Sequence, residues 1–189
     1  MRPSVISFAF VSVVLAACGD DPVQYSEPVG INLKAKSGDV AAATITEDKG
    51  ITTESGNPYG AFVANARAKL GGHDPSSIEI DDIKLLLGAG STNVTTLGEV
   101  FTGTTEVLFI MNDTNNTYPA GSASIAATAT SGPLPIAVTF DGAAVPAADY
   151  AKMLTGSFKV QLRGPASADF MGKGADADLQ VTFTFSAFE

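Results

Sequence analysis

Strict alternation of apolar and polar residues near the C-terminus constrains the fold of this chain more than any other feature. The pattern runs over residues 158–163 and returns over 179–185. A period of two places every apolar side chain of a segment on one face of a β-strand. A slip of one residue would turn all of them to water, so the register should be firmly set. We expect these side chains to face each other across one core: Phe158, Val160 and Leu162 against Val181, Phe183 and Phe185.

Shorter segments with the same period precede these two. In the segment 77–87, Ile78 and Ile80 are in one phase and Ile83, Leu85 and Leu87 in the other, with Asp81-Asp82 at the break. A phase slip of one residue is what a β-bulge produces. Glycine, proline, asparagine and aspartate separate the segments, as between the strands of a sandwich. The sequence therefore predicts a mainly β chain, a two-sheet antiparallel β-sandwich of Ig-like or jelly-roll-like type, whose other expected strands are 30–35, 40–46, 105–111, 121–130 and 136–140.

Two segments have helical features. Asn57 is a good N-cap, Pro58 suits the first helical position, and Gly71-Gly72 can end the helix. The segment 146–154 also has a proline at its start, which predicts a second short helix. We expect Asp48-Lys49-Gly50 to form a turn. The buried face of the first helix should consist of Tyr59, Phe62, Val63, Ala66 and Leu70.

The N-terminus has the features of a secretory signal. Arg2 precedes an apolar run from Val5 to Ala17, which is shorter than the roughly 20 residues of a membrane-spanning helix. The run ends in Leu15-Ala16-Ala17-Cys18, which resembles the lipobox of bacterial lipoproteins. That resemblance implies cleavage before Cys18 and lipidation of its thiol. The expected divisions are a signal peptide (1–17), an acidic flexible tether (18–29) and a β-sandwich domain (30–189).

Charge and cysteine content exclude several classes of function. The chain carries a formal net charge of −9, and loss of Arg2 with the signal peptide would make it −10. A surface of this sign is repelled by nucleic acid and by anionic lipid headgroups. We therefore expect no nucleic-acid partner, and attachment to the membrane through the lipid on Cys18. As the only cysteine, Cys18 permits no disulfide within the chain and no separate cysteine nucleophile.

Two groups of residues are candidates for catalysis. His73 is the only histidine, and its neighbour Asp74 is adjacent in sequence, which does not give the geometry of a catalytic triad. We expect an exposed histidine in a turn. Glu79 and Asp81, two apart on a strand, would share a face about 7 Å apart and could form an acid–base pair. The outward face of an ordinary strand has the same pattern, which is the favoured interpretation.

The polar loop after residue 111 is the candidate metal site. Asp113, Asn115 and Thr117 offer oxygen atoms at alternate positions, as a calcium loop does. The match to an EF-hand loop fails, because Tyr118 stands where that loop needs glycine. One carboxylate is also few for tight calcium binding. A hairpin turn rich in asparagine and aspartate is the favoured alternative.

The general pattern resembles small exported bacterial lipoproteins whose single β-sandwich has no assigned activity. The resemblance implies no catalytic residues. We expect a lipid-anchored, non-enzymatic binding or scaffold module of the cell envelope, with an envelope protein or polysaccharide as partner. Gly19, rather than aspartate, follows the cysteine, which favours the outer membrane, and Asp20-Asp21 resembles surface-export signals. The alternatives are a calcium- or carbohydrate-binding accessory domain and a hydrolase that uses Glu79 and Asp81.

Overall fold

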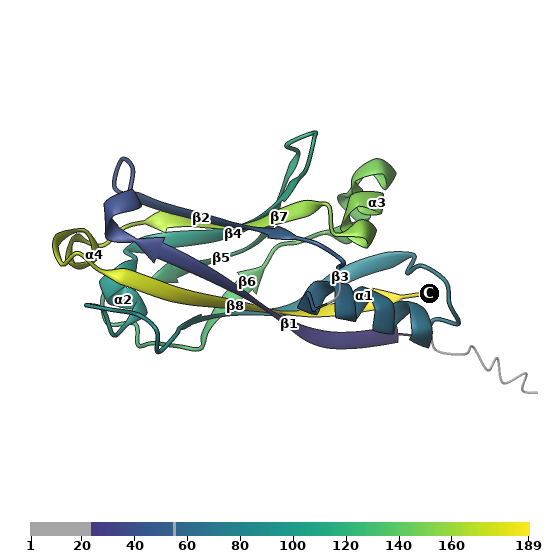
Figure 1. Cartoon of the computed structure of the whole chain (residues 1–189), viewed down its shortest axis with the longest axis horizontal. Helices are drawn as coiled ribbons and strands as arrows, with labels where there is room; N and C mark the ends of the chain where they lie inside the picture. The colour runs from purple at the N-terminus through teal and green to yellow at the C-terminus, as the bar shows by residue number, and fades with distance from the viewer. Residues whose placement is uncertain (1–23, 55) are drawn as a thin grey trace, which may run out of the picture.

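Eight antiparallel strands and four short helices make up the part of the chain that the computed structural model describes, residues 24–54 and 56–189 (Figure 1). The strands are β1 (Gln24–Lys36), β2 (Thr44–Ile51), β3 (Ser77–Leu87), β4 (Gly103–Met111), β5 (Thr117–Ile125), β6 (Leu134–Val138), β7 (Phe158–Pro165) and β8 (Asp176–Phe188). The helices are α1 (Pro58–Lys69), α2 (Leu97–Val100), α3 (Ala147–Thr155) and α4 (Ala168–Gly172), with 3-10 turns η1 (Ser37–Asp39) and η2 (Gly142–Ala144).

The strands pair from the middle of the chain outward, so that each pair encloses the previous one in sequence. β4 pairs with β5, β3 with β6, β2 with β7 and β1 with β8, all antiparallel. The strand order is β1-β8-β3-β6-β5-β4-β7-β2, and only two residue pairs join β6 to β5. The sheet bends at this short ladder, so that β1-β8-β3-β6 faces β5-β4-β7-β2. This is the arrangement of a jelly roll, which confirms the predicted mainly β sandwich and selects the jelly-roll type over the Ig-like one.

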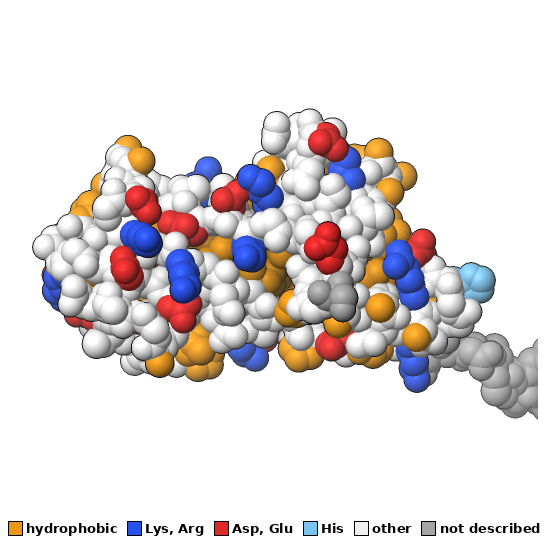
Figure 2. Space-filling view, in the orientation of Figure 1, with side chains coloured by type: hydrophobic (Ala, Val, Ile, Leu, Met, Phe, Trp, Pro, Cys, Tyr) orange, Lys and Arg blue, Asp and Glu red, His pale blue; other side chains and the backbone are white. Residues whose placement is uncertain are grey.

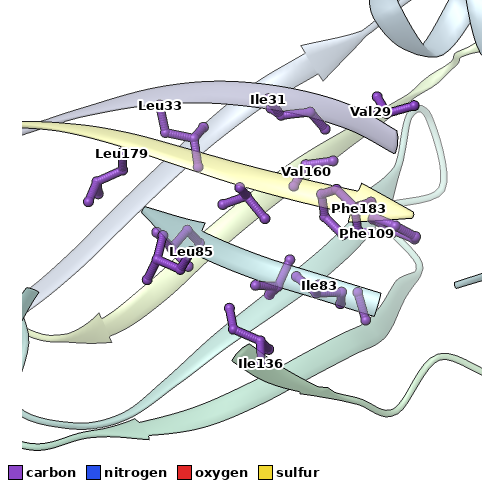
Figure 3. Close-up of a cluster of buried hydrophobic side chains, with 14 of the residues drawn as sticks. Val29, Ile31, Leu33, Ile83, Leu85, Phe109, Ile136, Val160, Leu179 and Phe183 are labelled. Carbon is purple, nitrogen blue, oxygen red and sulfur yellow. The ribbon is translucent and has the colours of Figure 1, made fainter. Parts of the chain in front are cut away.

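Aromatic rings fill the space between the two layers. Phe183 of β8 faces Phe109 of β4 with ring centroids 5.6 Å apart, and it stacks on Phe185 at 5.3 Å. Figure 3 shows apolar side chains of both layers converging in this space. All six residues expected to face each other across the core are fully buried: Phe158, Val160, Leu162, Val181, Phe183 and Phe185.

Helix α1 covers the place where β1 and β2 diverge (Figure 1). The Asn57 side chain caps it by accepting a hydrogen bond from the Tyr59 amide at 3.0 Å, and Pro58 is the first helical residue. Tyr59 and Phe62 insert between the layers, and the Phe62 ring stacks on Phe185 with centroids 5.4 Å apart. The helix and its whole expected buried face are therefore confirmed.

The bulge predicted in the segment 77–87 is also present. The register between β3 and β8 shifts between Ile80 and Asp82. Ile78 and Ile80 on one side of the shift, and Ile83 and Leu85 on the other, are all buried. The extra residue, Asp81, thus lets both apolar sets face the same core.

Several predicted boundaries are wrong, among them the expected strands 40–46 and 121–130, in whose place the structure has β2 (Thr44–Ile51) and β5 (Thr117–Ile125). The segment Gln24–Val29, assigned to the tether 18–29, belongs to β1 and pairs with β8 from Phe188 to Phe183. Proline and polar residues suggested a linker, but β1 is an edge strand, where a missing amide donor is tolerated. Asp48-Lys49-Gly50 is likewise part of β2, paired with Gln161 to Lys159, rather than a turn.

The predicted signal peptide and Cys18 lie outside the described residues. Among residues 24–54 and 56–189, no helix is long and apolar enough to cross a membrane.

Candidate functional site

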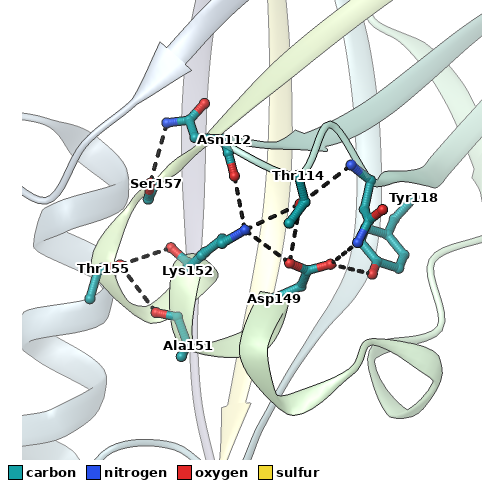
Figure 4. A network of polar contacts seen from close by, with 9 residues as sticks. Asn112, Thr114, Tyr118, Asp149, Ala151, Lys152, Thr155 and Ser157 are labelled. Carbon is teal, nitrogen blue, oxygen red and sulfur yellow. Dashed lines mark hydrogen bonds and ion pairs between the residues drawn. The ribbon is translucent and has the colours of Figure 1, made fainter.

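The most connected polar cluster joins the β4–β5 hairpin to α3 through a buried carboxylate (Figure 4). Asp149, in the first turn of α3, has only 2% of its surface exposed. Its Oδ2 accepts hydrogen bonds from Asn116 Nδ2 and the Tyr118 hydroxyl, both at 2.7 Å. Its Oδ1 accepts a longer one, 3.4 Å, from the Thr114 hydroxyl. Three side chains of the hairpin therefore converge on one carboxylate.

Lys152 completes the cluster from the next turn of α3. Its Nζ lies 3.2 Å from Asp149 Oδ1 and donates to the Asn112 carbonyl at 2.9 Å and to the Thr114 hydroxyl at 3.2 Å. Asn112 in turn donates from Nδ2 to the Ser157 hydroxyl at 3.3 Å. The ammonium thus neutralises the buried carboxylate and holds the hairpin backbone.

These contacts set the protonation state of the cluster. The hydrogen bond from Asn116, followed by that from Tyr118, lowers the pKa of Asp149 to about 2, although burial opposes the shift. The same bond to Asp149 raises the pKa of Tyr118. A carboxylate with so low a pKa is a weak base near neutral pH. The arrangement is suited to fastening the hairpin to α3 rather than to proton transfer.

The candidate calcium ligands lie on the same hairpin but outside this cluster. Asp113, Asn115 and Thr117 are exposed, and none of their side chains contacts Asp149 or Lys152. The hydroxyl of Thr117 donates to the Asn115 carbonyl at 3.3 Å. Within the described ranges, no group of three or more histidine, cysteine, aspartate or glutamate side chains is placed to hold a metal ion. The hairpin turn is present, and calcium binding stays a prediction.

Glu79 and Asp81 lie on the outer face of β3, and the structure gives them different surroundings. Asp81, the bulged residue, accepts hydrogen bonds at Oδ2 from Ser26 of β1 and Ser186 of β8. Glu79 is exposed, and its register partner on β8 is also Ser186. Asp81 thereby links three neighbouring strands, which gives it a structural use that strand periodicity alone did not reveal.

His73 is exposed in the loop between α1 and β3, as expected. Its amide donates to the Leu70 carbonyl at 3.3 Å at the end of the helix. The neighbouring Asp74 carboxylate pairs with the Arg67 guanidinium of α1. Asp74 is therefore engaged with an arginine rather than with the histidine.

A second polar cluster, which the sequence analysis missed, joins α2 to α4. Glu99 forms a capping box with Thr96 and lies 2.9 Å from Lys173 Nζ. The backbone amide of Thr95, followed by Lys173, lowers the pKa of Glu99 to about 2. The Thr96-x-x-Glu99 spacing is a recognisable capping-box signature that could have predicted this helix start.

A groove lies on the outer face of β4, β5 and β7. It has a volume of about 520 Å³ and an apolar floor formed by Leu108 and Pro119. Arg163 and Glu106 form an ion pair of 2.7 Å at its rim. On the face shown in Figure 2, acidic and basic side chains are intermixed rather than gathered by sign. The groove thus offers a paired rather than a free charge to a ligand.

Comparison with known proteins does not add to the fold described above. No protein family matches the chain, and no curated protein matches it. Among solved structures, it is similar to one described as Desmodium yellow mottle tymovirus, with a TM-score of 0.39 and 11% identity, over 100% of this chain and 93% of that one. A likeness at this level adds nothing to the strand order, which defines the jelly roll by itself.

Proposed function

We propose that this protein is an exported, lipid-anchored lipoprotein whose jelly-roll domain acts as a non-enzymatic binding or scaffold module of the cell envelope. The Leu15-Ala16-Ala17-Cys18 segment is the basis for the anchor. The uses found for the charged groups support a non-enzymatic role. Asp149 and Glu99 each fasten one loop or helix to another, and Asp81 links three strands.

The start of β1 carries the argument for how such a module would be held. β1 begins at Gln24 and is paired with β8 along its whole length, to Lys36. Only residues 19–23 separate Cys18 from this strand. At about 3.3–3.6 Å per residue, the six steps from Cys18 to Gln24 reach roughly 20 Å. A lipid on Cys18 would keep the domain close to the bilayer.

The same geometry gives the anchored domain an orientation. Gln24 is paired with Phe188, and Ser77 with the same residue, so the starts of β1 and β3 and the end of β8 share one end of the sandwich. In Figure 1 the helices α2 and α4 lie at the opposite end. An anchored domain would therefore present the α2–α4 end away from the membrane. That end is where we expect an envelope protein or polysaccharide to bind.

Fractionation of the full chain tests the anchor. Wild type should sediment with membranes and enter the detergent phase on phase separation, whereas Cys18→Ser should be released or remain unprocessed. Three acyl chains, at about 0.8 kcal/mol per buried methylene, would make the attachment effectively permanent. Recovery of wild type and Cys18→Ser in the same soluble fraction would overturn the proposal. Protease treatment of intact cells would then distinguish a surface domain, which is degraded, from one facing the periplasm.

A further inference from the structure

Three Asn-x-Ser/Thr sequences occur in the chain, and they differ in exposure and in hydrogen bonding. This tripeptide is the acceptor of N-linked glycans in exported proteins, provided that the middle residue is not proline. Attachment requires an asparagine amide that is exposed and not engaged elsewhere. The three are Asn93-Val94-Thr95, Asn112-Asp113-Thr114 and Asn115-Asn116-Thr117.

In the first acceptor sequence, both the asparagine and the threonine are hydrogen-bonded to other residues. Asn93 Nδ2 donates to the carbonyls of Lys173 and Gly174, each at 3.2 Å. The hydroxyl of Thr95 donates to Glu99 at 3.0 Å. The residue between them, Val94, is 4% exposed and belongs to the core. Modification there would require these contacts to break.

The second is built into the Asp149 cluster. Asn112 is half-buried and donates to the Ser157 hydroxyl, and its carbonyl accepts from Lys152. The Thr114 hydroxyl lies between Asp149 and Lys152. This acceptor sequence forms the base of the hairpin and is unavailable for the same reason as the first.

The third lies at the tip of the hairpin, which projects from the β-sheet beside α3 (Figure 1). Asn115 is exposed, and its carboxamide makes no hydrogen bond with any described residue. Its φ of 55° differs from that of a regular strand, so the chain turns at this residue. Thr117 is also exposed, and its hydroxyl donates only within the same tripeptide, to the Asn115 carbonyl at 3.3 Å. Asp113, two residues before the asparagine, is exposed as well.

We propose that Asn115 is the acceptor of an N-linked oligosaccharide. The inference rests on the export proposed above, because the glycan would be added outside the cytoplasm. The Asp149 cluster would serve this role by holding Thr114 and Asn116 on either side, while the Asn115 carboxamide makes no hydrogen bond with a described residue and remains available to a transferase. The glycan would then cover Asp113 to Thr117.

The reaction balances with a polyprenyl diphosphate-linked oligosaccharide as donor. Nδ2 of Asn115 forms a bond with the anomeric carbon of the first sugar. The bond from that carbon to the phosphate oxygen breaks, and polyprenyl diphosphate leaves. One amide proton passes to a base of the transferase. No oxidant or reductant is needed.

The test is mass spectrometry of peptides from the full chain purified from the envelope of its own host. The peptide containing Asn115 should carry a hexose or hexosamine oligosaccharide, while those containing Asn93 and Asn112 should be unmodified at these residues. Asn115→Gln and Thr117→Ala should abolish the modification. Thr117→Ser keeps the acceptor hydroxyl and should retain it, as should Asn93→Gln.

The state of Cys18 in the same sample separates this inference from the proposed function. A lipidated chain with unmodified Asn115 would overturn the glycan inference alone. A glycan at Asn115 on a chain without lipid would support the inference and overturn the anchor. A chain with neither modification would overturn both, and a glycan on Asn93 or Asn112 instead of Asn115 would contradict the selection by accessibility.

Discussion

At the scale of single residues, the buried Asp149 carboxylate is the group on which the hairpin most depends. Asp149→Asn would place an amide nitrogen against the donors of Asn116 or Tyr118 and leave Lys152 without its counter-charge. A buried donor without an acceptor is unfavourable. We expect a clearly lower melting temperature at neutral pH. Asp113→Asn, on the exposed part of the same hairpin, is the matched control and should melt close to wild type.

The low pKa of Asp149 predicts how stability depends on pH. Because its pKa falls from an ordinary 3.8 to about 2 on folding, the unfolded chain binds the proton more tightly. Its stabilising contribution is therefore complete above about pH 4 and is lost as the pH falls toward 2. Urea unfolding between pH 5 and 2 should show a smaller loss of stability for Asp149→Asn than for wild type. Parallel curves would show that Asp149 does not titrate in this way.

Two tyrosines form a matched pair for the energetics of buried hydroxyls. The Tyr59 hydroxyl is buried and has no hydrogen-bond partner among the described residues, whereas the Tyr150 hydroxyl donates to the Pro75 carbonyl at 2.7 Å. Tyr59→Phe removes an unsatisfied group and should stabilise the domain by up to about 1 kcal/mol. Tyr150→Phe removes a hydrogen bond and should destabilise it by about 1 kcal/mol. A destabilising Tyr59→Phe together with a stabilising Tyr150→Phe in urea unfolding would contradict the two assignments.

At the scale of elements, the sequence predicted those features that neighbouring residues determine by themselves, such as helix ends and bulges. The N-cap at Asn57, followed by proline and closed by Gly71-Gly72, marked α1 correctly. The break at Asp81-Asp82 located the bulge in β3 because both apolar sets must face one core. The start of β1 and the middle of β2 could not be found this way. Their polar, turn-forming residues are strands only because β8 and β7, more than a hundred residues later, pair with them.

The polar clusters were hidden from sequence analysis for a similar reason. The partners of Asp149 on the hairpin are more than thirty residues earlier in the chain, and no spacing rule connects them. Asp113, Asn115 and Thr117 were the candidate ligands there, and nothing in the local sequence pattern tells which side chains of the hairpin face α3. Thr114 and Asn116 make the contacts instead.

The strand β8 offers the sharpest stability test of the core. Phe183 is fully buried between Phe109 and Phe185. Phe183→Ala should cost about 3–5 kcal/mol, from the lost transfer energy and the remaining cavity. That is a large part of a typical stability of about 5–15 kcal/mol. The exposed Glu79→Ala on β3 should change stability by no more than about 0.5 kcal/mol. A mild effect of the first and a severe effect of the second would contradict the assignment of inside and outside.

At the scale of the whole molecule, residues 24–54 and 56–189 form the jelly roll, whereas the proposed anchor depends on residues 15–18. Nested strand pairs roll the chain into a jelly roll, and α1 covers the opening between its edge strands. The fold alone does not imply a function. The proposed function comes from the N-terminal sequence, and the structure adds that β1 begins at Gln24. Together they are the basis for proposing an acidic domain that a lipid would hold near a membrane surface that repels its negative charge.

Mass spectrometry of the N-terminal peptide from the membrane-bound protein tests this account most directly. The lipoprotein proposal predicts that the mature chain begins at Cys18 and that this cysteine carries a diacylglyceryl group on sulfur and an acyl chain on its amino group. Cys18→Ser, analysed in parallel, should lack both and should keep residues 1–17 or leave the membrane. A mature wild-type chain with an unmodified Cys18, or one that retains residues 1–17, would contradict the account.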